Sequence, residues 1–304
     1  MDHGSVRAAI NPMQGATRKW LFRIIGVVAL TAAVFYLWRA FAGYGVAILE
    51  IADQNVEFYG LIGGAAFVYA GSLLLLGWAW IAFLLPPALP AQRFKLLRLY
   101  GLSSAAKYLP GGVLHFGGRQ WGGAQLGLSQ RSLAAASIME AGASVFAAFL
   151  LAVLLCAGGY LTMVPAAAFA IAGVMLGGAR HHDAPLSVIR GAGLVLLFMM
   201  IMAGLVMGCA VLAGTESALP ALAGAYLIAW AAGFVIPGLS AGLGVREAVF
   251  IFLAAGGEPA PDLVAVTLFM RVLTTAGDGL FFAGFLAFDR KGPRLVKELS
   301  SIDC

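Results

Sequence analysis

Long apolar stretches separated by short polar connections constrain this chain more than any other feature of its sequence. A helix that crosses a bilayer needs about 20 mostly apolar residues. Only 11% of the 304 residues are Asp, Glu, Lys or Arg, and a soluble core of this size could not bury the apolar remainder. The sequence therefore predicts an all-α, polytopic integral membrane protein. The expected spans are residues 20–40, 58–85, 132–156, 159–179, 191–213, 218–236, 244–256 and 262–288.

This pattern predicts about eight transmembrane helices in a single transmembrane domain, residues 20–288, between polar tails at 1–19 and 289–304. Segment 244–256 is short for a span, so it either crosses the bilayer or is re-entrant. Lys and Arg gather before the first span and after the second, fourth and last, with Arg39 as the exception. The positive-inside rule then places both termini on the cytoplasmic side of the cytoplasmic (inner) membrane. The net charge of +5 is explained by orientation and does not indicate nucleic acid.

Two segments rich in Pro and Gly interrupt the apolar pattern, one in each half of the chain. The first, residues 107–119, contains Lys107, Pro110, His115 and Arg119, and the second, residues 237–247, ends in Arg246 and Glu247. Broken helices in both halves of a transporter indicate a substrate site where the halves meet. We therefore expect re-entrant or broken elements here; the alternative is two ordinary cytoplasmic loops whose arginines set orientation.

Ionisable side chains inside expected spans add candidates to the same site. Glu140 interrupts the third span, and Arg271 and Asp278 interrupt the last. Such residues are costly in a bilayer and usually face the bundle interior. Arg271 and Asp278 lie two helical turns apart and share a face, so they could also form a buried ion pair that fixes helix packing.

Arginine matches the oxygens of phosphate with two parallel hydrogen bonds. A cavity that holds Arg119, Arg246 and Arg271, with Lys107 near its mouth, would therefore suit an anionic head group. Glu140 and Glu247 could balance the arginines when the site is empty, or carry a coupling proton.

No cofactor or metal is expected. The sequence contains no P-loop motif, and the pair His181–His182 lacks the additional ligands that a zinc site needs. The expected partner is a membrane lipid with an anionic head group. A second copy of the chain, or an enzyme of envelope biosynthesis, remains open as a protein partner.

The interrupted segments carry a family resemblance. K-Y-L-P-G-G-V-L-H-F-G-G-R, from Lys107 to Arg119, resembles the K-Y-x-P-G-N-x-x-H-x-x-G-R stretch of the lysylphosphatidylglycerol synthase transmembrane-domain family. A-G-L-G-V-R-E, ending at Glu247, resembles its P-G-G-x-G-V-R-E signature, and Glu140 falls where the family often has glutamate. Gly112 replaces a common Asn, and Ser240 and Ala241 replace Pro-Gly. The resemblance implies a polytopic fold with re-entrant elements and translocation of phospholipids, without the soluble aminoacyl-transferase domain.

Three functions fit these patterns. The leading hypothesis is a flippase-like transporter, not an enzyme, for an anionic lipid or a polyprenyl-phosphate-linked substrate. The second is a membrane-embedded enzyme acting on a lipid phosphate or lipid-linked sugar, with His115, Glu140 and Glu247 as acid and base groups. The third is a non-catalytic accessory subunit of a cell-envelope lipid or glycan pathway.

Overall fold

A computed structural model describes residues 58–85, 90–108, 114–179, 184–215, 218–236, 242, 244–255 and 260–289. These residues form helices joined by short connections, and no strand occurs among them. The expected span 20–40 and both tails lie outside the described residues. The elements are α2 (Phe58–Ala82), α3 (Pro90–Ser104), η1 (Ala105–Tyr108), α4 (Leu114–Gln125), α5 (Gln130–Gly158), η2 (Gly159–Thr162), α6 (Met163–Ala179), α7 (Ala184–Leu212), α8 (Leu219–Val235), α9 (Val245–Ala255) and α10 (Pro261–Asp289).

Four of the described stretches are long and apolar enough to cross a membrane. They are Phe58–Ala82, Gln130–Met175, Pro185–Leu212 and Pro261–Ala287. The second stretch includes α5 and most of α6, which the 3-10 helix η2 separates. The apolar helix α8 has 17 residues and α9 has 11. The all-α prediction is thus confirmed and the apolar helices fit a multi-pass membrane protein, whereas the count of eight spans is not confirmed.

Large apolar side chains cover outer faces of these helices. Phe67, Phe146, Phe169 and Phe252 each expose between 66% and 69% of their surface. A soluble monomer rarely leaves so many large apolar side chains in water. In a bilayer the same side chains contact lipid chains at no such cost, so these faces suit a lipid environment.

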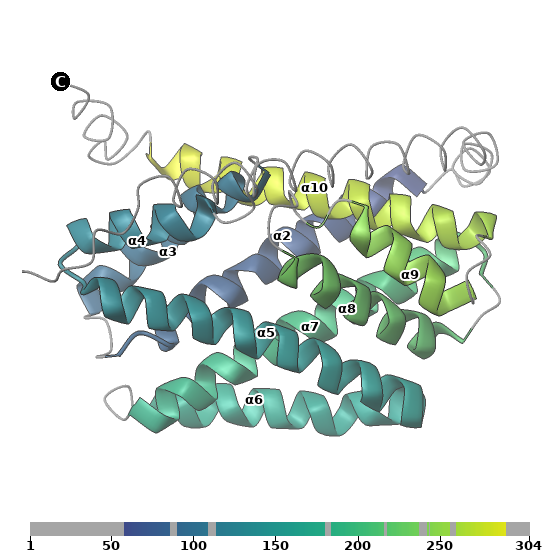
Figure 1. Ribbon diagram of the computed structural model, residues 1–304, viewed down its shortest axis with the longest axis horizontal. Coiled ribbons are helices and arrows are strands. Elements are labelled where there is room, and N and C mark those ends of the chain that lie inside the picture. Colours follow the sequence, from purple (N-terminus) through teal and green to yellow (C-terminus); the bar gives the residue numbers. More distant parts are fainter. Residues whose placement is uncertain are drawn as a thin grey trace, which may run out of the picture.

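Helix α7 lies at the centre of the bundle and contacts α2, α5, α6, α8 and α10. Figure 1 shows α6 along one side of the bundle and α10 along the other. Helix α6 packs closely on α7 because Gly193 has no side chain: a Cβ there would lie 2.7 Å from the carbonyl oxygen of Ala170. Small residues allow this close approach of helix backbones in membranes.

The chain between the second and third expected spans is more helical than the sequence suggested. Residues 90–125 were expected to be a basic connection followed by a broken segment, but they form α3, η1 and α4. Helix α4 ends in a Schellman motif, in which Gly127 has φ 84° and the Leu128 N–H donates to the Gly123 carbonyl. Ser129 then caps α5 by accepting a hydrogen bond from the Ser132 N–H at 3.1 Å. This tight turn positions α4 against α3 and α5.

Candidate functional site

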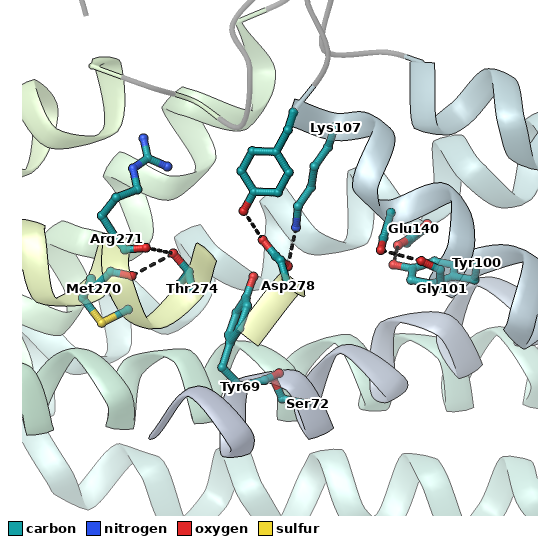
Figure 2. A network of polar contacts seen from close by, with 12 residues as sticks. Tyr69, Ser72, Tyr100, Gly101, Lys107, Glu140, Met270, Arg271, Thr274 and Asp278 are labelled. Atoms are coloured by element: carbon teal, nitrogen blue, oxygen red, sulfur yellow. Dashed lines mark hydrogen bonds and ion pairs between the residues drawn. The ribbon is translucent and has the colours of Figure 1, made fainter. Parts of the chain in front are cut away.

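A cavity of about 230 Å³ lies inside the bundle. Side chains from α2, η1, α5, α9 and α10 line it, together with residues of α3, α4, α7 and α8. Its charged side chains come from two parts of the chain that are far apart in sequence, residues 107–140 and residues 246–278. Figure 2 shows a part of this site, where Lys107 and Tyr69 point toward Asp278.

The structure brings most of the expected site residues to this one cavity. Its lining includes Lys107, His115, Arg119, Glu140, Arg246, Arg271 and Asp278. Glu247 is buried just behind the lining, where it holds Arg271. Pro110 lies outside the described residues. Both interrupted segments therefore contribute to the same cavity, although their role in binding stays a prediction.

Arg119 and Glu140 form a buried ion pair on one side of the cavity. The Arg119 Nη1 lies 2.6 Å from Oε2 of Glu140, and the two side chains are 5% and 8% exposed. The Tyr100 hydroxyl donates to the other carboxylate oxygen at 2.5 Å. The face of the Arg119 guanidinium also lies on the Tyr100 ring, 3.7 Å from its centroid. This cluster joins α3, α4 and α5. Arg119, which was predicted to bind an anion, is therefore already paired with Glu140.

Asp278 is the centre of a second cluster. Its Oδ1 accepts from the Lys107 ammonium at 2.6 Å, and its Oδ2 accepts from the Tyr108 hydroxyl. Both donors belong to η1, so this contact fastens the first interrupted segment to α10. Burial, and then the Asp278 carboxylate, raise the pKa of Tyr108. The phenol therefore keeps its proton and acts as a hydrogen-bond donor at neutral pH.

Glu247 organises a third cluster at the start of α9. Its Oε2 accepts from the Gly244 N–H at 2.7 Å, as in the reciprocal half of a capping box. Its Oε1 lies 2.8 Å from Nη2 of Arg271. Gly244 has φ 83°, a conformation that side chains other than glycine rarely adopt. The G-V-R-E sequence thus places a carboxylate where it both begins α9 and holds an arginine of α10.

Gly242 explains why the second interrupted segment is rich in glycine. It has φ 69°, and a Cβ there would lie 3.1 Å from the Cα and the carbonyl oxygen of Gly233 on α8. The Gly233 position would in turn place a Cβ 3.4 Å from the Cβ of Arg246. Two glycines therefore let the chain before α9 pass close to α8, which brings Arg246 to the cavity wall.

Arg271 and Asp278 share the cavity-facing side of α10, as their spacing predicts. The alternative, an ion pair between these two residues, is not what the structure contains. Each binds an oppositely charged partner from another element: Arg271 binds Glu247 of α9, and Asp278 binds Lys107 of η1. These ion pairs link helices instead of stabilising a single helix face.

Arg246 differs from the other cations of the cavity. Among the described residues, it forms no ion pair of its own with a carboxylate. It lies near the phenols of Tyr226 and Tyr69 and near the Glu247 carboxylate. Its Nε, like that of Arg119, is buried without a hydrogen-bond partner among the described residues. Among the described cations of the cavity wall, Arg246 is therefore the arginine that no carboxylate pairs with directly.

Aromatic residues of this site were missed by sequence reasoning. Tyr69, Tyr100 and Tyr108 line the cavity, and Tyr226 is buried beside Arg246. Burial, together with the Glu140 carboxylate, raises the pKa of Tyr100. A tyrosine inside an apolar run usually needs a polar partner, and that rule could have identified them. His115 also lines the cavity, with its ring centroid 4.0 Å from that of Phe116.

Within the described ranges, no group of three His, Cys, Asp or Glu is placed to hold a metal ion. His181 and His182 lie outside those ranges. The cavity's chemistry is therefore that of arginine, lysine, imidazole, carboxylate and phenol groups. These groups can bind an anion, pair with each other and exchange hydrogen-bond partners.

The fold and the site define an all-α protein with membrane-length apolar helices and a charged internal cavity. Comparisons with protein-family models, with curated proteins and with solved structures gave no match. The resemblance to the lysylphosphatidylglycerol synthase transmembrane-domain family therefore rests on the motif residues alone and stays a prediction.

Proposed function

We propose that this chain is a flippase-like transporter that moves an anionic lipid, or a polyprenyl-phosphate-linked lipid, across the cytoplasmic membrane. The observation that carries the proposal is the meeting of both interrupted segments at one charged cavity inside a bundle of apolar helices. Charged side chains buried at membrane depth usually mark a substrate or ion pathway.

The arrangement of the site supports a transporter in which broken segments line the substrate path. Lys107 and Arg119 are the two ends of the first interrupted segment, and Arg246 lies near the end of the second. Non-helical backbone within a membrane is tolerated where it is buried in protein or lines a wet cavity. Described residues of both segments, among them Lys107, Arg119 and Arg246, line the cavity, which supports this arrangement.

Ion pairs between the elements offer a way to change conformation. The Lys107–Asp278 and Arg271–Glu247 pairs each join an interrupted segment to α10. An anionic lipid head group that competes for Lys107 or Arg271 would weaken these links. The ligand would then favour a different arrangement of the segments by its differential affinity for the two states.

The enzyme alternative is less well supported by the geometry. An acid–base mechanism would use His115, Glu140 or Glu247, and both oxygens of each of the two carboxylates already accept a hydrogen bond or an ion pair. A general base must reach the proton that it removes, and both carboxylates are directed toward protein partners.

We also propose, from the charge pattern of the connections, that both termini are cytoplasmic.

The test is lipid movement in proteoliposomes that contain fluorescent anionic, zwitterionic and polyprenyl-phosphate lipids. Wild type is compared with Arg246→Gln, with Arg119→Gln, and with Arg131→Gln as a matched control, because Arg131 is exposed and outside the cavity. We expect one lipid class to move, the two cavity variants to lose that movement, and Arg131→Gln to keep it. Movement no faster than in protein-free vesicles would contradict the proposal.

A further inference from the structure

The three carboxylates at the cavity share one pattern of contacts. Each is held by one cation and by one neutral donor: Glu140 by Arg119 and Tyr100, Asp278 by Lys107 and Tyr108, and Glu247 by Arg271 and the Gly244 N–H. Both oxygens of each carboxylate take part in these contacts. Each carboxylate is therefore matched with one cation, and its hydrogen bonds are completed by the protein.

Arg246 belongs to none of these three ion pairs. Four cations and three carboxylates lie in or directly behind the cavity wall, which leaves one positive charge. The parts of the interrupted segments that the structure does not describe do not alter this balance, because residues 109–113, 237–241 and 243 contain no ionisable side chain. Among the described residues of the site, the uncompensated charge is therefore that of Arg246.

Arg246 is partly buried, and a charge withdrawn from water without a counter-charge is unfavourable, so a ligand that supplies one negative charge is matched to this cavity. We propose that the site takes the singly charged phosphodiester of a membrane lipid at Arg246, in preference to a doubly charged phosphomonoester. This inference rests on the proposed function, in which the cavity receives a lipid head group. It narrows the substrate class to diesters.

The chemistry of a guanidinium suits a diester. A guanidinium can donate two parallel hydrogen bonds to the two non-bridging oxygens of such a group. A monoester carries about two negative charges above its second pKa of about 6, so it would leave one negative charge unbalanced in the cavity. Apolar side chains of α2 and α7, namely Leu73, Leu76 and Phe198, form another part of the wall, where the glycerol and first chain carbons could lie.

The test is direct binding to the purified full chain in detergent at about pH 8, where a phosphomonoester is doubly charged. The probes are short-chain lipids with identical chains: dihexanoyl phosphatidylglycerol, a diester with one negative charge, and dihexanoyl phosphatidic acid, a monoester. We expect wild type to bind the diester about tenfold or more tightly than the monoester, since a hydrogen-bonded charge pair contributes that order of affinity.

Three variants test the charge balance. Arg246→Gln should lose about 10- to 100-fold in diester affinity, and Arg246→Lys, which retains the charge, should keep the preference for the diester. Asp278→Asn keeps the shape of the side chain but adds one positive charge, so it should shift the preference toward the monoester. Asp262→Asn is the matched control: Asp262 lies in the first turn of α10, outside the cavity, and its loss should leave the preference unchanged.

The outcomes separate this inference from transport. Selective diester binding that depends on Arg246, and that Asp278→Asn shifts, supports the inference even if no lipid moves in vesicles. Equal binding of both lipids, tighter binding of the monoester by wild type, or no binding of either lipid overturns the inference. Lipid movement in vesicles alongside equal binding would leave the proposed function standing and refute only the choice of a diester.

Discussion

The substitution Glu140→Gln removes the charge that balances Arg119 while almost preserving the shape of the side chain. Both partners are buried, at 5% and 8% exposure, and their closest atoms are 2.6 Å apart. Breaking a buried ion pair by removing one partner typically costs about 3–5 kcal/mol, because the other charge is left unpaired. Glutamine can still accept from Tyr100, so we expect a loss of about 3 kcal/mol in the free energy of unfolding.

The measurement is a double-mutant cycle in mixed micelles, with helix content followed during denaturant-induced unfolding. The cycle compares wild type, Glu140→Gln, Arg119→Met and the double variant. We expect the double variant to recover part of the loss, with a coupling energy of about 2 kcal/mol. Asp262→Asn is the control, because its partly exposed carboxylate near a helix start should contribute less than about 1 kcal/mol. A Glu140→Gln protein within about 0.5 kcal/mol of wild type, or a coupling near zero, would refute the reasoning.

Two further predictions concern the interrupted segments. Gly242→Ala should destabilise the protein by about 1–3 kcal/mol, because Gly242 has φ 69° and a Cβ there would lie 3.1 Å from Gly233. Gly204→Ala is the control: a Cβ at position 204 meets open space, so this change should cost nothing in the same unfolding measurement. The pKa of the Tyr108 phenol, ordinarily 10.0, is raised in the folded protein. The contribution of this phenol to the free energy of unfolding is therefore complete below pH 10.0 and is lost as the pH rises above it, because the phenol ionises first in the unfolded chain. Unfolding midpoints at about pH 9 and about pH 11 should therefore differ less in Tyr108→Phe than in wild type, and exposed Tyr59→Phe should behave as wild type; an unchanged difference in Tyr108→Phe would contradict this.

The helices that the sequence predicts well are those with long apolar runs. The expected spans 58–85 and 262–288 correspond to α2 and α10, because few polar residues interrupt them and prolines lie near their ends. The expected span 191–213 begins seven residues after the start of α7 at Ala184. Because Arg190 is charged, the sequence around it was assigned to a polar connection, although arginine is a good helix former.

Helix α3 was missed for a related reason. Arg93, Lys95 and Arg98 lower the apolar character of the segment below that of a span. Leu96, Leu97 and Tyr100 nevertheless form a buried face at helical spacing, and Pro90 stands at the first helical position. A search for membrane-length apolar runs passes over a short helix of this kind, which buries only part of its surface.

The composition of the site could be predicted, but its pairing could not. Ionisable residues within apolar runs, and arginines that end Gly-rich segments, pointed to the residues that line the cavity. The partners depend on tertiary packing: Arg119 and Glu140 are 21 residues apart, and Lys107 and Asp278 are 171 apart. Only the assembled helices determine that three cations are neutralised by carboxylates while Arg246 faces the cavity.

The proposed function requires that this cavity hold the head group of an anionic lipid, and cross-linking at the cavity wall tests this directly. A photoreactive leucine analogue placed at Leu76, which lines the cavity, is compared with one at Leu74, which is on the same helix and 37% exposed. After irradiation in native membranes, mass spectrometry identifies the attached lipids. We expect anionic lipids to be enriched at position 76 over position 74, and Arg246→Gln to abolish the enrichment. The same lipid composition at both positions, with or without Arg246, would contradict the proposed function.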